Sequence, residues 1–102
     1  METLSVLNSE EQTIQSSYDL VKGVFTHEEA AEIVEDLFLK KINFNKQKNF
    51  RRFIQMGLES TEIKERIHEL KKAYKQAEKQ IQKAKEEGKQ LCISSSIIIN
   101  IQ

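Results

Sequence analysis

The side chains with the most reactive chemistry in this chain are two histidines, His27 and His68, and a single cysteine, Cys92. His27 is followed directly by Glu28 and Glu29, and a histidine beside a carboxylate can act as a general acid–base pair. The two histidines are far apart in sequence, however, and a chain with 16 acidic residues forms such neighbours by chance. Because geometry must support a catalytic role, we predict no catalytic residue.

No other motif supplies catalytic or metal chemistry. Cys92 lies among serines, without a neighbouring cation or helix N-terminus that would stabilise its thiolate. A lone cysteine forms no disulfide within the chain, and the histidines and the cysteine lack the spacing of a zinc site. A Gly-rich phosphate loop, a nucleophile elbow and the sequence H-E-x-x-H are also absent. We therefore predict that the protein is not an enzyme and holds neither metal nor cofactor.

A basic and aromatic run, KKINFNKQKNFRR at residues 40–52, is a candidate for nucleic-acid binding. It holds six cations and no acidic residue, and Phe44 and Phe50 lie between them. Cations attract phosphates, and aromatic rings stack on bases. The preceding residues 27–39 hold five acidic residues and no Lys or Arg, so the two runs can neutralise each other. Nucleic-acid contact is therefore the alternative function, with these contact residues: Lys40, Lys41, Lys46, Lys48, Arg51 and Arg52.

The clearest predicted element is a long amphipathic helix over residues 62–87. Ser60 or Thr61 can cap its start, Gly88 can end it, and the 26 residues between Thr61 and Gly88 contain neither Gly nor Pro. Apolar residues recur there with alternating spacings of four and three, which is typical of a helix that packs along another helix. We call these residues the packing seam: Ile63, Ile67, Leu70, Tyr74, Ala77, Ile81 and Ala84.

Two shorter helices are predicted before the long one, over residues 9–22 and 27–41. The first carries a short stripe of three apolar residues and ends near Gly23. The second has acidic residues at its start and lysines at its end, as the helix dipole favours. Each begins with the spacing of a capping box, Ser9 with Gln12 and Thr26 with Glu29.

The acidic helix 27–41 is expected to pack antiparallel against the basic-flanked helix 62–87, which gives a helical hairpin. Residues 42–60 then form the connector, because three asparagines and Gly57 interrupt any long helical period. The large apolar residues of this connector are expected to be partly buried. Residues 1–8 are predicted as a flexible segment or a short strand.

After Gly88 the apolar pattern changes to a period of two, which predicts a β-strand over residues 90–101. A single strand cannot satisfy its own backbone hydrogen bonds, so this one needs a partner. The partner is a second copy of the strand, another protein, or the short segment 2–7 of the same chain. The predicted interface is the apolar face of residues 91–101, made of Leu91, Ile93, Ile97, Ile99 and Ile101.

Composition limits the class of protein. Basic and acidic residues both number 16, so the chain is neutral overall, which favours neither polyanions nor membranes as partners. No apolar run reaches the roughly 18 residues of a membrane helix, and the first residues lack the basic segment and apolar stretch of a signal peptide. With one free cysteine, these features predict a cytoplasmic protein, of a bacterium or a phage, without a membrane partner.

Together the patterns predict one small domain, residues 1–102, of the α+β class and mostly helical. We expect a non-enzymatic module for protein–protein interaction that forms a homodimer through its C-terminal strand or binds another protein there. Strand addition suits this role, because main-chain hydrogen bonds provide affinity and alternate side chains provide specificity.

Overall fold

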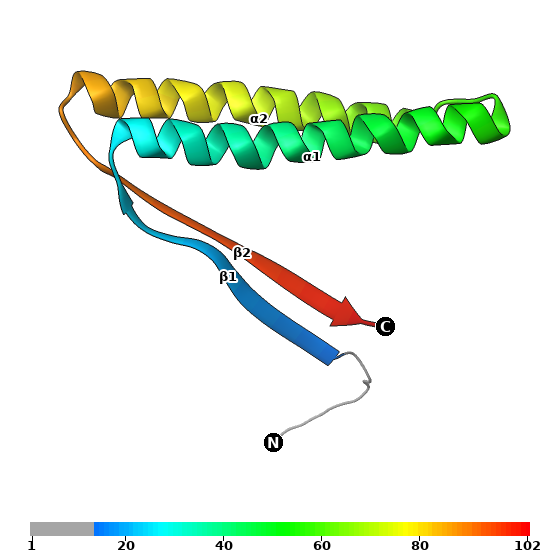
Figure 1. Ribbon diagram of the computed structural model, residues 1–102, viewed down its shortest axis with the longest axis horizontal. Helices are drawn as coiled ribbons and strands as arrows, with labels where there is room; N and C mark the ends of the chain where they lie inside the picture. Colours follow the sequence, from blue (N-terminus) through cyan, green and yellow to red (C-terminus); the bar gives the residue numbers. More distant parts are fainter. Residues whose placement is uncertain (1–13) are drawn as a thin grey trace. The chain divides into compact units, whose positions relative to one another are not determined.

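The computed structural model describes residues 14–102 (Figure 1). In chain order it contains β1 (Ile14–Phe25), α1 (His27–Met56), α2 (Thr61–Glu86) and β2 (Leu91–Ile101). The fold is α+β and mostly helical, as predicted. It divides into two compact units, the helical hairpin, Val24–Leu91, and the strand pair, in which residues 14–23 lie with Cys92–Gln102. Folding as a single domain stays a prediction.

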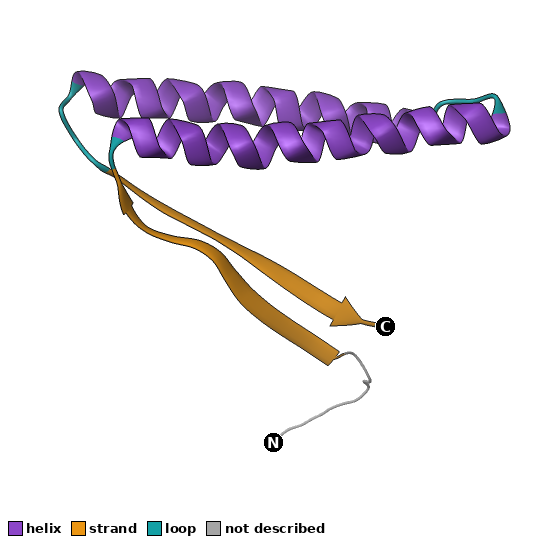
Figure 2. Cartoon of the chain, in the orientation of Figure 1, coloured by secondary structure: helices purple, strands orange, loops and turns teal. Residues whose placement is uncertain are grey.

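The strand pair is a two-stranded antiparallel sheet of β1 and β2 (Figure 2). β2 lies where the sequence predicts a strand, and its partner is β1 of the same chain, so the helix predicted over 9–22 is wrong for residues 14–22. Three apolar residues do not define a helical face, whereas Ile, Val and Tyr suit a strand, and β2 supplies the backbone hydrogen bonds that β1 needs. The segment 2–7, the first capping box and residues 1–8 lie outside the described residues.

α1 begins at the second predicted capping box and is much longer than predicted. The Thr26 hydroxyl accepts a hydrogen bond from the Glu29 amide (3.1 Å), and the Glu29 carboxylate accepts one from the Thr26 amide (3.0 Å). The helix continues through Met56 and ends at Gly57, whose φ of 72° favours glycine. The predicted helix end at residue 41 and the connector 42–60 are therefore wrong, and residues 57–60 alone join the helices.

The asparagines of α1 do not break the helix, because two of them are buried and hydrogen-bonded. Asn45 Nδ2 donates to the Lys41 carbonyl one turn earlier (3.0 Å). Asn49 Oδ1 accepts from the Ser60 amide across the turn (2.7 Å). Asn43 is exposed. A buried asparagine is compatible with a helix when its side chain finds such partners, and local spacing does not reveal them.

α2 matches the predicted long helix, with Ser60 as its N-cap and Gly88 just after its end. All seven residues of the packing seam are buried or half-buried, and every other residue of α2 is exposed. α1 and α2 lie side by side in opposite directions (Figure 1), and the rings of Phe38 and Tyr74 stack with centroids 5.6 Å apart. The predicted antiparallel hairpin is therefore confirmed. Within residues 14–102 four apolar residues are buried, and they form its small core: Ala30, Ile42, Leu70 and Ile81.

Charge is segregated along both arms of the hairpin, in opposite directions. In α1, residues 27–39 hold five acidic residues and residues 40–52 hold six basic ones. In the second arm, residues 59–69 hold four glutamates and two cations, and residues 71–85 hold six lysines and one glutamate. Antiparallel packing places the acidic half of α1 beside the basic half of α2, although the ion pairs among the described residues each lie within one arm. Near the turn, residues 40–69 keep a net charge of +4, from eight cations and four carboxylates.

Candidate interaction surfaces

β2 exposes its apolar residues unevenly along its length. Of the predicted interface, Leu91 and Ile93 are half-buried, whereas the three outer residues are exposed. Ile98, which the period of two places on the polar face, is exposed as well, so both faces of this end are apolar. We call four residues that are 45% to 61% exposed the uncovered isoleucines: Ile97, Ile98, Ile99 and Ile101.

Each strand of the sheet has one edge without a neighbouring strand among residues 14–102. β1 carries Asp19 and Lys22, and charged side chains protect a sheet edge from pairing with other chains. β2 has neither a charged residue nor a proline, so its edge is unprotected. β1 adds the exposed Tyr18 and Leu20, which the sequence placed on a predicted helix. A two-stranded sheet of this kind is only marginally stable by itself.

A second apolar surface lies where α1 turns into α2. Five large side chains there are 47% to 68% exposed, and we call them the hairpin tip: Phe50, Phe53, Ile54, Met56 and Leu58. At roughly 200 Å² per large apolar side chain they expose about 600 Å², and monomer patches of that size are often functional. These residues were expected to be partly buried, and each leaves about half or more of its side chain exposed. No segment of the described chain covers the last turns of α1.

The six predicted nucleic-acid contacts all lie on α1, and five of them share one exposed side of the helix. These five recur at intervals of three and four residues around Phe44. Lys46 lies on the opposite side of the helix. We call the five the basic face: Lys40, Lys41, Lys48, Arg51 and Arg52. Lys41 Nζ lies 4.9 Å from the centre of the Phe44 ring. Of the six cations, only Lys40 forms an ion pair within the described residues, with Asp36 at 3.2 Å.

The reactive side chains are not brought together. His27 is the first residue of α1, at the end of the hairpin away from the turn, whereas His68 lies two turns into α2. Nε2 of His27 is buried without a hydrogen-bond partner among the described residues, and Cys92 is exposed on β2. Within residues 14–102, no three His, Cys, Asp or Glu side chains are grouped so that they could hold a metal ion.

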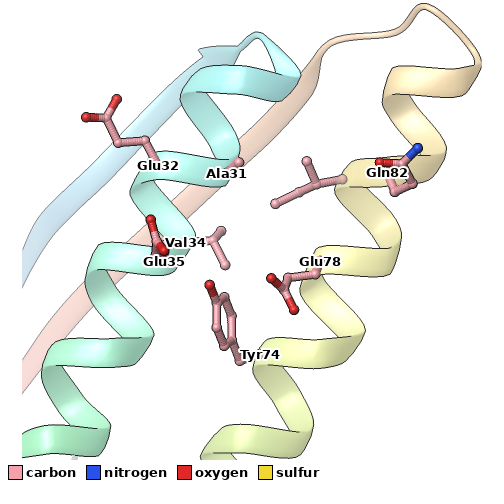
Figure 3. A pocket seen from close by; sticks show the side chains of 8 residues that line it. Ala31, Glu32, Val34, Glu35, Tyr74, Glu78 and Gln82 are labelled. Atoms are coloured by element: carbon pink, nitrogen blue, oxygen red, sulfur yellow. The ribbon is translucent and has the colours of Figure 1, made fainter.

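A groove of about 440 Å³ lies between α1 and α2, and Tyr74 lines it (Figure 3). Glu35 of α1 and Glu78 of α2 line the same groove. Desolvation raises the pKa of Tyr74 above its ordinary value, and the negative charges of Glu78 and Glu35 raise it further. The folded hairpin therefore binds the phenol proton more tightly than the unfolded chain does.

The alkaline titration of Tyr74 should report this environment. In a Tyr18→Phe background the absorbance change follows Tyr74 alone, and its midpoint should lie above pH 10.0. Stability from the neutral phenol is complete below that pH and is lost as the pH rises through the folded pKa. Glu78→Gln should lower the midpoint, whereas Glu69→Gln, at an exposed site of α2, should not. A midpoint unaffected by Glu78→Gln would show that this carboxylate does not act on Tyr74.

Comparisons with protein-family models, with curated proteins and with solved structures give no match to this chain. None of the described helices is both long enough and apolar enough to cross a bilayer. The functional interpretation therefore depends on three exposed features: the edge of β2 with the uncovered isoleucines, the hairpin tip, and the basic face.

Proposed function

We propose that the protein is a non-enzymatic interaction module that forms a homodimer by pairing β2 with the β2 strand of a second copy. The observation that carries this proposal is the uncharged edge of β2, which has no neighbour among the described residues. Such an edge offers a row of main-chain donors and acceptors to another strand. Pairing with a second copy satisfies them along the strand.

A second copy suits this edge because β2 is complementary to itself. Two antiparallel β2 strands related by a twofold axis exchange main-chain hydrogen bonds, and no like charges meet because the strand carries none. The two pairs then form a four-stranded sheet in the order β1-β2-β2-β1, and about three strands are needed for independent stability. The uncovered isoleucines of the two copies become cross-strand neighbours, which adds apolar contact.

Charged substitutions on β2 test the homodimer. Light scattering after size exclusion should give the wild-type protein twice the 11.9 kDa mass of one chain. The double variant Ile97→Lys, Ile99→Lys should be monomeric, because lysines of the two copies would meet across the twofold pair. Ser17→Lys adds one lysine at an exposed position of β1 and should remain dimeric.

Circular dichroism should show the helical content of all three proteins unchanged, since the substitutions lie outside the hairpin. A double variant that keeps the dimeric mass contradicts the proposal. So does a monomeric wild-type protein, or a dimer that persists after residues 91–102 are deleted.

Nucleic-acid binding through the basic face is the alternative function. It is supported by five cations that surround Phe44 on one side of α1. Fluorescence anisotropy with mixed DNA and RNA at about 50 mM salt tests it, because binding to phosphates strengthens as salt falls. The absence of binding under those conditions excludes this alternative.

A further inference from the structure

The hairpin tip is a short apolar zone at the end of a long helix. Four of its five residues lie in the last two turns of α1, and Leu58 lies in the turn that follows. At 1.5 Å per residue these four occupy about 9 Å of the helix axis, and they spread over about half of the helix circumference. A surface of this shape is not a groove for a single partner helix. It suits a partner into which the end of the hairpin can be inserted.

The charge at this end of the hairpin is positive, although three of its cations form ion pairs with carboxylates. Residues 40–69 carry +4, from eight cations and four carboxylates. Glu59, the acidic residue of the turn, is paired with Lys64. Three cations lie within about 12 Å of the end of α1 and have no ion pair among the described residues. They are Lys48, Arg51 and Arg52.

We infer that the hairpin tip is a docking surface for an anionic lipid bilayer. Apolar side chains of amphipathic elements enter the boundary between headgroups and acyl chains to a depth of about 5–10 Å, and the apolar zone of α1 is about 9 Å long. Lys48 lies just behind this zone, whereas Arg51 and Arg52 lie within it on another side of α1, and their long side chains can extend back to the level of the anionic headgroups. Each cation near such a surface strengthens partitioning about fivefold.

Two other partners fit this surface less well. A nucleic acid would satisfy the cations but leave Ile54, Met56 and Leu58 uncovered, because aliphatic side chains provide no ring on which bases can stack. The tip of a second copy would bring another +4 beside the first, and like charges oppose that contact. The neutrality of the whole chain predicted no membrane partner, but segregation of the charges along the hairpin makes this end cationic.

Sedimentation of the full chain with lipid vesicles tests the inference. Vesicles of phosphatidylcholine with about one-third phosphatidylserine should bind the wild-type protein at least about tenfold more strongly than phosphatidylcholine alone. Arg51→Gln with Arg52→Gln should weaken binding to the anionic vesicles about 30-fold. Phe50→Ser with Ile54→Ser should weaken it at least about tenfold. Leu39→Ser removes an exposed leucine about 16 Å from Phe50 on the same helix and should bind as the wild type does.

Three results would overturn the inference: no binding to anionic vesicles, equal binding to neutral ones, or a loss in Leu39→Ser as large as in the tip variant. Binding of a short DNA duplex in place of vesicles, unaffected by Phe50→Ser with Ile54→Ser, would also overturn it and assign the cations to nucleic acid. Light scattering on the same variants reports the β2 homodimer independently. Failure of one proposal therefore leaves the other measurable.

Discussion

Leu70→Ala should lower the free energy of unfolding of the hairpin by about 2–5 kcal/mol. Leu70 is one of four buried apolar residues among those described, and its truncation removes apolar burial and leaves a cavity. It lies level with Ile42 of α1, since each is four residues from the stacked pair of Phe38 and Tyr74, in opposite chain directions. The cavity therefore opens in the middle of the packing seam.

The expected loss is a large share of the total, because a unit of this size is typically stable by only about 3–10 kcal/mol. Leu39→Ala is the matched control, since it makes the same change on α1 at an exposed position and should cost less than about 1 kcal/mol. Urea unfolding followed by circular dichroism measures both variants. Similar losses in the two would mean that the packing seam is not the source of hairpin stability.

The sequence predicts most closely the helix and the strand whose residue spacing is regular along most of their length. In α2 the spacing of four and three continues from Ile63 to Ala84, and Gly88 follows directly. In β2 isoleucines fall mostly at a period of two, at Ile93, Ile97, Ile99 and Ile101. Each pattern is long enough to distinguish a helix from a strand. The residues within α2 and within β2 are therefore enough to predict each element.

The errors concern residues whose partners lie elsewhere in the chain. Asn45 and Asn49 look like helix breakers in isolation, yet both are buried in α1, and Asn49 bonds to Ser60 beyond the turn. β1 carries only three residues at helical spacing, and its strand conformation depends on β2 at the opposite end of the described chain. Local pattern cannot supply either partner.

Net charge and general burial tendencies, taken over the whole chain, do not reveal the candidate surfaces. The net charge of zero hides an end of the hairpin with a charge of +4 over residues 40–69. Large apolar residues such as Phe50 and Leu58 were expected to be partly buried, because such side chains are most often found inside proteins. A four-residue turn leaves them exposed, and the length of that turn follows only from the continuity of α1.

Asn49→Ala should destabilise the hairpin by about 1–3 kcal/mol. Asn49 is only 5% exposed, and its Oδ1 accepts a hydrogen bond from the Ser60 amide at 2.7 Å. This bond joins the last turns of α1 to the N-cap residue of α2, so it closes the hairpin. Alanine would leave the Ser60 amide without its acceptor in a partly buried site, and an unpaired donor there costs more than the net gain of forming the bond.

A control variant separates the hydrogen bond from other effects of the substitution. Asn43→Ala makes the same change at an exposed position of α1, so it gains the same helix propensity without losing the bond, and stability should stay equal or rise slightly. Urea unfolding followed by circular dichroism measures both variants. If Asn49→Ala is no less stable than Asn43→Ala, the Ser60 amide needs no acceptor, and the packing seam alone closes the hairpin.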